Sequence, residues 1–286
     1  MNFKITVLAT LALCLSLTAN AHATNPLNNP NGIAFDTQGH LWVANYVGNT
    51  VVALDPANGA LLHTISQGLS GPTRLFFASP EILYVANTKG NTITAYNIKT
   101  LKLVNTISNS NINGPLGIAL DAYGDVYIAN NQENNVIVLN IDGGLIETIT
   151  QDNSGFIYTA PGVVVIHGQN IYIGIGPNAG PNGVISYNVG EFLTNNPKEV
   201  EVYNDNVNTG PTAITFDSKN HVYIAEYTSA TAVEYSPRGK RLMVINQHLD
   251  GPEGIALNGG KIYISNSNPN NIAVFNAQGT WLYNLD

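Results

Sequence analysis

Cysteine is almost absent from this chain, and its absence excludes several kinds of site. The single cysteine, Cys14, lies in an apolar segment near the N-terminus, so the rest of the chain can form no disulfide, thiolate metal site or cysteine nucleophile. A chain of 286 residues is large enough to bury a substantial core without disulfides. Its stability must therefore come from packing and hydrogen bonds.

Charged residues are also scarce, and most of them are acidic. Lysine and arginine total 11 against 19 aspartates and glutamates, which gives a formal net charge of −8. Binding to a phosphate backbone depends on clusters of basic residues, and the sequence contains none. Nucleic acid is therefore not an expected partner.

No apolar run reaches the roughly 18 residues that a membrane-spanning helix needs. The apolar run at residues 5–17 follows Lys4 and precedes two Ala-x-Ala sites that end at Ala21 and Ala23, which is the order of a secretory signal peptide. We therefore expect residues 1–23 to be a signal peptide cleaved after Ala21 or Ala23. The mature protein is expected to be secreted or periplasmic, without a membrane anchor.

One phrase recurs six times along the rest of the chain. Each copy has a proline, an apolar segment such as Gly-Ile-Ala-Phe-Asp, and a second such as Leu-Trp-Val-Ala-Asn. The prolines are Pro30, Pro72, Pro115, Pro161, Pro211 and Pro252, spaced by 42, 43, 46, 50 and 41 residues. A period of about 40 to 50 residues with several short strands per unit is typical of a β-propeller. The sequence therefore predicts an all-β, six-bladed β-propeller of four-stranded antiparallel blades, filling residues 24–286 as a single domain.

Turn residues divide each repeat into four expected strands. In the first copy these strands are residues 32–35, 41–44, 50–54 and 60–65. Helix is expected only as one turn around residues 190–195. No strand is left over to complete a blade from the other terminus, so the ring must close by packing between the first and last blades, with residues 24–29 along the seam.

The repeats resemble those of the NHL-repeat propellers, whose unit reads approximately Gly-Ile-Ala-x-Asp, x-x-Gly, x-Ile-Tyr-Val-Ala-Asp and Asn-x-Arg-Ile. The second copy contains Leu83-Tyr-Val-Ala-Asn87 and also resembles the YVTN-type repeats of bacterial surface proteins. Uncharged residues replace the NHL arginine in every copy, so the basic face of some NHL proteins is absent. Both resemblances indicate the fold and leave the activity open, because propellers host unrelated functions.

Loops of all six blades are expected to meet around the axis on the side of the Gly-Pro turns, and function in propellers concentrates where such loops converge. The candidate ligand-binding residues end the second strand of a repeat or begin the first: Asn45, Arg74, Asn87, Asn130, Glu226, Glu253 and Asn266. Two irregular loops of the fourth repeat, residues 150–160 and 174–183, are expected to form a lip beside them. A small molecule or a protein is the expected partner of a monomeric chain.

The polar residues of this set allow more than one interpretation. An asparagine at a strand end commonly ties its amide to the turn backbone, and it can also contact a ligand. Glu226 replaces that asparagine in one repeat only, and it is either a cation ligand or general base at the channel mouth or a locally paired surface residue. Glu226, Glu253 and Asn266 are therefore the candidate metal ligands, with weak binding of Ca2+ or another divalent cation expected.

The repeat design is also similar to that of two groups of six-bladed enzymes, the virginiamycin B lyases and the senescence-marker/gluconolactonase proteins. This similarity implies a divalent metal at the axial mouth. The lyases have a histidine after the repeat proline and a glutamate at the end of the second strand. This chain has Asn31, Thr73, Leu116, Gly162, Thr212 and Glu253 at the first position, and only Glu226 matches at the second.

The histidines give an enzyme little support. His40, His167 and His221 fall in or beside the turns between the first and second strands, on the side opposite the Gly-Pro loops, and only His248 precedes such a loop. No phosphate loop, nucleophile elbow or paired metal histidines occur. The sequence thus favours an exported binding scaffold, with a metal-dependent lyase or lactonase-type hydrolase as the alternative.

Overall fold

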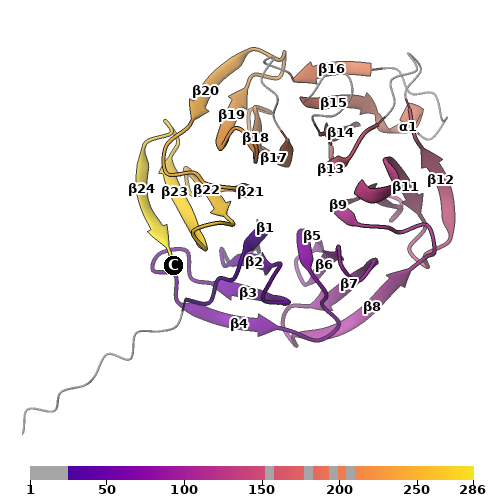
Figure 1. The fold of residues 1–286 in the computed structure, drawn as a ribbon, viewed down its shortest axis with the longest axis horizontal. Helices are drawn as coiled ribbons and strands as arrows, with labels where there is room; N and C mark the ends of the chain where they lie inside the picture. The colour runs from indigo at the N-terminus through magenta and orange to yellow at the C-terminus, as the bar shows by residue number, and fades with distance from the viewer. Residues whose placement is uncertain (1–24, 152–157, 177–182, 193–198, 204–209) are drawn as a thin grey trace, which may run out of the picture.

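The computed structural model describes residues 25–151, 158–176, 183–192, 199–203 and 210–286. Its strands form six four-stranded antiparallel sheets arranged in a ring, which confirms the predicted six-bladed propeller (Figure 1). The first strand of each blade lies near the axis and the fourth lies at the rim. The expected signal peptide and the central parts of both expected lip loops lie outside the described residues.

Each blade consists of four consecutive strands. Blade 1 contains β1 Pro30–Phe35, β2 Leu41–Asn45, β3 Thr50–Leu54 and β4 Leu61–Ile65. Blade 2 contains β5 Pro72–Ser79, β6 Ile82–Asn87, β7 Thr92–Asn97 and β8 Lys102–Ser108. Blade 3 contains β9 Pro115–Leu120, β10 Val126–Asn130, β11 Asn135–Leu139 and β12 Leu145–Ile149. Blade 4 contains β13 Pro161–His167, β14 Asn170–Ile175, β15 Gly183–Asn188 and β16 Glu199–Tyr203. Blade 5 contains β17 Pro211–Phe216, β18 Val222–Glu226, β19 Thr231–Tyr235 and β20 Arg241–Ile245. Blade 6 contains β21 Pro252–Asn258, β22 Lys261–Asn266, β23 Asn271–Asn276 and β24 Trp281–Leu285.

Helix is minimal in the part of the chain that the structure describes. It consists of the short 3-10 helix η1 Asn131–Glu133 and the single α-helical turn α1 Val189–Phe192. The turn α1 lies where the sequence predicts one. No helix of the described residues is long and apolar enough to cross a membrane.

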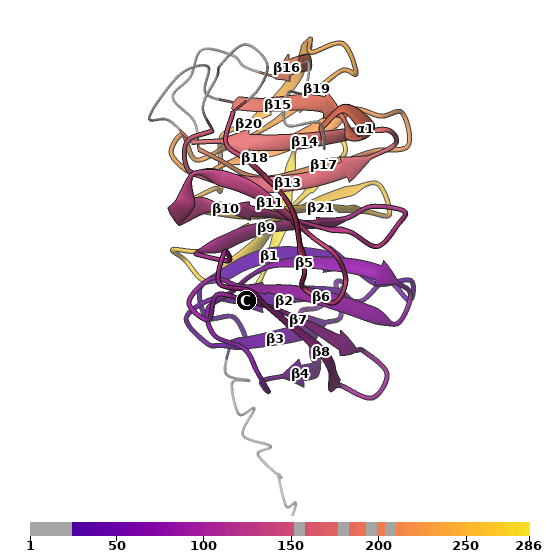
Figure 2. The same ribbon diagram turned by 90° about the vertical axis from the view of Figure 1, so that its right-hand side faces the viewer.

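The core lies between the blades. Six apolar clusters combine side chains of adjacent blades, one cluster for each blade-to-blade interface, where the sheets pack face to face around the ring (Figure 2). The aromatic residue that recurs in every second strand is at most 7% exposed; its six copies are Trp42, Tyr84, Tyr127, Tyr172, Tyr223 and Tyr263. Burial of one large apolar side chain contributes roughly 1.5–3 kcal/mol. The repeated pattern therefore supplies the stability that disulfides do not.

The ring closes by packing between blades 1 and 6, as the sequence predicts. Asn25 Nδ2 donates to the Asn270 carbonyl at 2.9 Å, and the Asn29 N–H donates to Oδ1 of Asn270 at 2.5 Å. Leu27 is 4% exposed and belongs to the apolar cluster shared by the two blades. The segment that follows the predicted cleavage site therefore joins the first blade to the last.

Every first strand begins with a β-bulge, which the sequence analysis did not predict. In each blade the repeat proline pairs with the residue at the end of the second strand, and one extra residue follows before the regular register resumes. The residues after the six prolines, from Asn31 in blade 1 to Glu253 in blade 6, lie in these bulges. A bulge twists its strand and changes the direction of its side chains. It therefore decides which side chains near the strand start reach the axis.

Candidate functional site

The two ends of the propeller carry different residues. At one end, here called the proline end, the repeat prolines pair with residues such as Asn45 and Glu226. All seven candidate residues belong to this end, because they either close the second strand or begin the first. At the opposite end, here called the turn end, lie the turns between first and second strands, which contain His40 and His221.

Asn45 shows how the ring of asparagines is used. Its side chain is buried, with 1% of the residue exposed. Its Oδ1 accepts the N–H of Asn28 at 3.0 Å, and its Nδ2 donates to the Pro26 carbonyl at 2.9 Å and to Thr50 Oγ1 at 3.1 Å. The amide thus ties the loop before β1 to the blade's own second and third strands.

The same arrangement recurs in blades 2, 3 and 6. The amide oxygens of Asn87, Asn130 and Asn266 accept the backbone N–H of Ser70, Asn113 and Asp250 at 3.2, 2.6 and 3.1 Å. All three asparagines are at most 1% exposed, and none of them lines the axial cavity described below. Their positions favour the first of the two interpretations above, in which the amide holds turn backbone.

Glu226 occupies the equivalent place in blade 5 and is 4% exposed. Its Oε2 accepts the hydroxyls of Ser229 at 3.2 Å and of Thr231 at 2.9 Å. Like the asparagines, it is engaged within its own blade. It is not among the residues that line the axial cavity.

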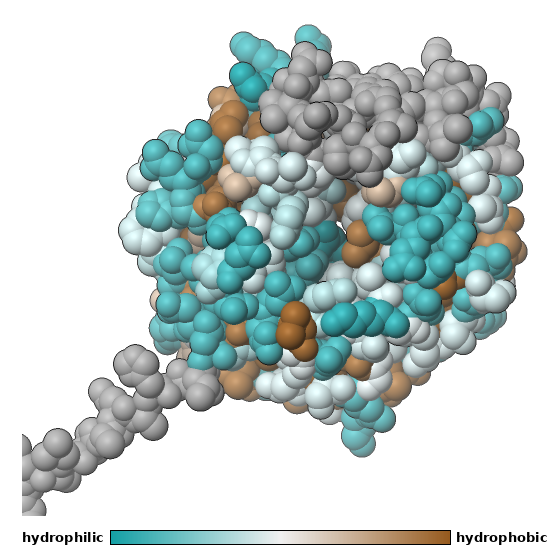
Figure 3. Space-filling model, viewed as in Figure 1, coloured by the Kyte–Doolittle hydropathy of each residue, from teal (hydrophilic) through white to brown (hydrophobic). Residues whose placement is uncertain are grey.

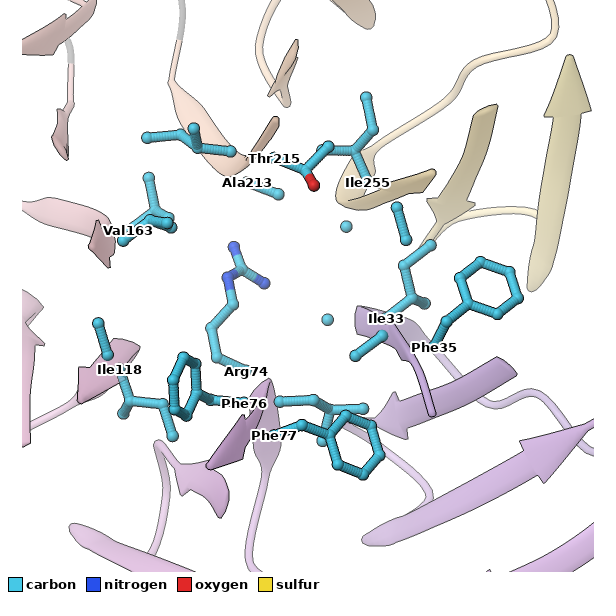
Figure 4. A pocket seen from close by; sticks show the side chains of 18 of the residues that line it. Ile33, Phe35, Arg74, Phe76, Phe77, Ile118, Val163, Ala213, Thr215 and Ile255 are labelled. Carbon is cyan, nitrogen blue, oxygen red and sulfur yellow. The ribbon is translucent and has the colours of Figure 1, made fainter. Parts of the chain in front are cut away.

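Arg74 differs from the rest of the set because its side chain enters the axis. It extends from β5 toward the middle of a cavity of about 360 Å³, and Val163 and Ala213 lie on the walls beyond its guanidinium (Figure 4). Its Nη1 donates to Oδ1 of Asn31 at 2.8 Å, while its buried Nε has no hydrogen-bond partner among the described residues. Burial lowers the pKa of the guanidinium to about 10, and the charge of Glu253 acts in the opposite direction. Arg74 is therefore still a cation at neutral pH.

The cavity is formed by the first strands of all six blades. Apart from Arg74 and Thr215, the described residues that line it are apolar side chains or glycines, such as Ile33, Val163 and Ile255. The face viewed in Figure 3 is mostly hydrophilic and is hollowed near its centre. A single cation thus lies in an apolar cavity inside a polar rim.

Glu253 completes a polar group at the start of the first strands of blades 6, 1 and 2. Burial raises the pKa of its carboxyl, whereas the charge of Arg74 and a hydrogen bond with Asn31 lower it. The carboxylate is not within ion-pair distance of Arg74. Asn31 therefore lies between the two charged groups and holds the guanidinium by its amide oxygen.

Asn31 was not among the residues selected from the sequence. The available signal was its place directly after a repeat proline, which it shares with Glu253. The contact between Asn31 and Arg74 joins blades 1 and 2, so it follows from the curvature of the ring and the bulges rather than from spacing along the chain.

The proposed metal ligands do not fit a divalent cation. Glu226, Glu253 and Asn266 lie at the proline end of two adjacent blades, but their oxygens have separate partners. Asn266 Oδ1 accepts a backbone N–H, Glu226 accepts two hydroxyls, and Glu253 faces the guanidinium of Arg74. A hard cation gains most of its affinity from converging anionic oxygens, and a nearby guanidinium repels it.

Comparison with known proteins supports the fold. A family model described as "SMP-30/Gluconolactonase/LRE-like region" matches residues 15–88, which is about a quarter of the chain. No curated protein sequence matches the chain.

Several solved structures share the architecture. Virginiamycin B lyase from Staphylococcus aureus is 14% identical, with a TM-score of 0.65 over 88% of this chain and 83% of that one. A streptogramin B lyase is 16% identical, with a TM-score of 0.66 over 91% and 83% of the two chains. A catalytically inactive form of the Staphylococcus aureus enzyme, solved with quinupristin, is 14% identical with a TM-score of 0.65 over 91% and 85%. The chain is therefore a six-bladed propeller distantly similar to these proteins, and identities this low show the fold alone.

Proposed function

We propose that this protein is an exported propeller that binds a small anionic molecule with an apolar part in its axial cavity. The observation that carries the proposal is Arg74, the one charged side chain among the described residues that line the cavity. A buried cation is costly unless it is paired and hydrogen-bonded. Its presence in a largely apolar cavity is explained if a ligand supplies the missing partner.

The free donor of Arg74 specifies the kind of partner. A guanidinium presents its N–H groups in a planar fork that matches a carboxylate or a phosphate, and here Nε has no acceptor in the part of the chain that the structure describes. Leaving a buried donor unsatisfied costs about 1–3 kcal/mol, which an anionic ligand would recover. The apolar walls would exclude water and strengthen that contact.

The size of the cavity and the neighbouring carboxylate define the ligand further. A volume of about 360 Å³ lies at the lower end of the range for small-molecule sites. Glu253 competes with an anion for the field of Arg74, so a ligand with a single negative group is favoured over a multiply charged one.

Isothermal titration with matched six-carbon probes tests this function. We expect hexanoate to bind at least about tenfold more tightly than hexanol, a difference of about 1.4 kcal/mol, and hexylammonium to bind least. Arg74→Gln should remove the preference for hexanoate, whereas Arg238→Gln, which changes an exposed arginine in a turn, should keep it. Equal binding of hexanoate and hexanol by the wild type, or no binding of either hexanoate or hexyl phosphate, would contradict the proposal.

A metal-dependent lactonase or lyase is the second candidate, supported by the match to the gluconolactonase-like family model and by the fold shared with streptogramin B lyases. The donors at the proline end do not favour it, for the reasons given above. Elemental analysis of the purified protein, together with mass spectrometry of quinupristin and of gluconolactone after incubation, distinguishes the two. Ring opening that is lost in Glu253→Gln would favour the enzyme over the binding scaffold.

A further inference from the structure

Asp217, His221 and Glu234 come together at the turn end of blade 5, away from the axial cavity. Nδ1 of His221 lies 2.7 Å from Oε1 of Glu234 and 3.4 Å from Oδ2 of Asp217. One ligand atom of each residue lies within 4.8 Å of the other two, and no other group of three His, Cys, Asp or Glu side chains in the described ranges does so. We propose that these residues form a binding site for a divalent transition metal, with zinc as its occupant.

The fold fixes the three side chains on one sheet. Asp217 follows β17, and its Oδ1 accepts the backbone N–H of Lys219 at 2.8 Å and of His221 at 2.9 Å, which leaves Oδ2 facing the imidazole. His221 directly precedes β18, and Glu234 lies in β19, paired with Tyr223. Ligands held by strands and a tight turn of a single blade are well ordered before any metal arrives.

Comparison among the six blades shows that Glu234 is an exception. The residue paired with the recurrent aromatic is uncharged in every other blade: Ala53, Ala95, Val138, Ser186 and Val274. A carboxylate at this position is not needed to build a blade. Its contact with His221 Nδ1 is therefore a specific addition of blade 5.

Blade 1 provides a counterpart without the third ligand. There Asp36 Oδ2 lies 3.0 Å from His40 Nδ1, and the same oxygen accepts the indole N–H of Trp42 at 3.0 Å. One carboxylate and one imidazole satisfy each other, and Ala53 occupies the place of the glutamate.

In blade 5 a second carboxylate faces the same ring nitrogen. One proton on Nδ1 can make one good hydrogen bond, and the 3.4 Å distance to Asp217 is too long for a second. A metal ion can bind the imidazole nitrogen and both carboxylate oxygens at the same time.

The donor set suits zinc better than calcium. One neutral imidazole and two carboxylates balance the double charge of the ion, and an imidazole ligand selects transition metals over hard cations. Zinc binds imidazole nitrogen at about 2.0–2.1 Å and carboxylate oxygen at about 2.0–2.2 Å, so its ligand atoms lie about 3.4 Å apart in a tetrahedral site. The separations of the three atoms, from 2.7 Å to at most 4.8 Å, span that value.

The site borders a cavity that can supply a fourth ligand. Of the three ligands, Asp217 lines this cavity of about 610 Å³ together with Lys219, Tyr223 and residues of the β21–β22 turn. The three ligand side chains are between 12% and 24% exposed, so the ion can reach them. Three protein ligands with an open position are typical of zinc sites that bind water or a substrate.

Zinc titration of the metal-free, untagged full chain tests the site. Isothermal titration should give one zinc ion per chain, and Co2+ should develop visible absorption bands on binding. His221→Ala and Glu234→Gln should each weaken zinc at least about tenfold, because changes even to outer-shell partners of metal ligands cost 10- to 100-fold. His40→Ala, the matched change in blade 1, should leave the affinity unchanged. Circular dichroism and thermal unfolding in EDTA confirm that each variant is folded.

The proposal is wrong if the folded wild type binds no zinc, or if His40→Ala reduces the zinc affinity as much as His221→Ala does. It is also wrong if Glu234→Gln binds zinc with the affinity of the wild type and gives the same visible absorption bands with Co2+. If Glu234→Gln unfolds, Asp217→Asn takes its place and must show the same loss. None of these results depends on the axial cavity, since Arg74→Gln is expected to bind zinc normally.

Discussion

Blades 1 and 5 follow the same pattern, and three of the differences between them change the polar groups of the blade. Asn45, Trp42 and Ala53 of blade 1 correspond to Glu226, Tyr223 and Glu234 of blade 5. In blade 1 the polar groups near these positions hold the fold: the Asn45 amide binds the loop before β1, and Asp36 accepts the indole N–H of Trp42. Blade 5 keeps the sheet and adds two carboxylates that the sheet does not need.

The axis shows the same contrast. Two residues after the repeat proline, blade 1 has Gly32, where an added Cβ would lie 2.3 Å from the Thr73 carbonyl, so neighbouring first strands approach too closely for a side chain. At that position blade 2 has Arg74, which turns into the cavity. Repeated residues thus build the ring, and departures from the repeat supply charge. Substitution of a repeated residue should reduce stability, and substitution of a residue that departs from the repeat should mainly change binding.

The largest loss of stability is expected from Asn45→Ala. The change removes three hydrogen bonds of a buried amide, including both bonds to the seam segment that joins blades 1 and 6. Unsatisfied buried groups cost about 1–3 kcal/mol each, and we expect a total loss of about 3 kcal/mol in urea unfolding. Asn58→Ala, at an exposed turn with one bond to the Ala60 N–H, should cost less than about 1 kcal/mol. Similar losses for the two variants would show that the ring of asparagines is not structural.

Trp42→Phe should reduce stability by about 2 kcal/mol. The variant loses the hydrogen bond from the indole N–H to the carboxylate of Asp36. Because Trp42 is only 1% exposed, the smaller ring also leaves a void in the core. In blade 5 the matched change Tyr223→Phe also removes a hydrogen bond to a carboxylate, that of Glu234, but it leaves a much smaller void and should cost less. Thermal unfolding of both variants compares them directly, and an equal or larger loss in blade 5 would contradict the contrast.

Arg74→Met should change binding and leave stability almost unaffected, because Arg74 is a residue that departs from the repeat. Replacing a buried ion with an apolar side chain of similar length is often neutral or stabilising. Glu253 loses its attraction to the guanidinium, which offsets part of that gain. We expect the free energy of unfolding to stay the same or rise by about 1 kcal/mol, while the preference for hexanoate over hexanol is lost. A strongly destabilised variant would show that Arg74 is structural.

Most of the fold could be predicted because the same physical pattern is written six times. β3 and β4 end where the sequence places them, and the residues that precede β1 lie along the seam between blades 1 and 6. An apolar run between turn residues fixes a strand whichever blade it belongs to. The bulges were missed because one extra residue leaves the hydrophobic pattern unchanged.

The polar sites were less predictable. The asparagines were easy to find, but whether an amide turns to its own loop or to the axis depends on backbone direction, as for Asn45. Asn31 and Arg74 are 43 residues apart and meet only because blades 1 and 2 are adjacent. For Glu234 a signal did exist, since it is the one charged residue in a column of apolar and small ones. Alignment of the third strands with one another would have found it.

The smallest expected effect concerns Glu253 and pH. Burial raises the pKa of this carboxyl in the folded protein above its usual value of 4.5, although Arg74 and Asn31 oppose the shift. The folded state therefore takes up the proton more readily than the unfolded state, so this contribution to stability is present below the unfolded pKa and is lost as pH rises through the folded pKa. Glutamine does not ionise, so Glu253→Gln should gain stability relative to the wild type as pH rises from about 4 to about 7.

Glu81→Gln is the control of opposite sign. The hydrogen bond and charge of Lys99, whose Nζ lies 2.5 Å from Oε1, lower the pKa of the exposed Glu81 carboxyl. Its contribution to stability is present above the unfolded pKa and is lost as pH falls through the folded pKa. The free energy of unfolding of the wild type should therefore rise relative to that of Glu81→Gln over the same increase in pH, although solvent screening keeps the change small. Urea unfolding of both variants at the two ends of this range measures the signs, and a constant difference for Glu253→Gln would mean that burial does not raise the pKa of its carboxyl.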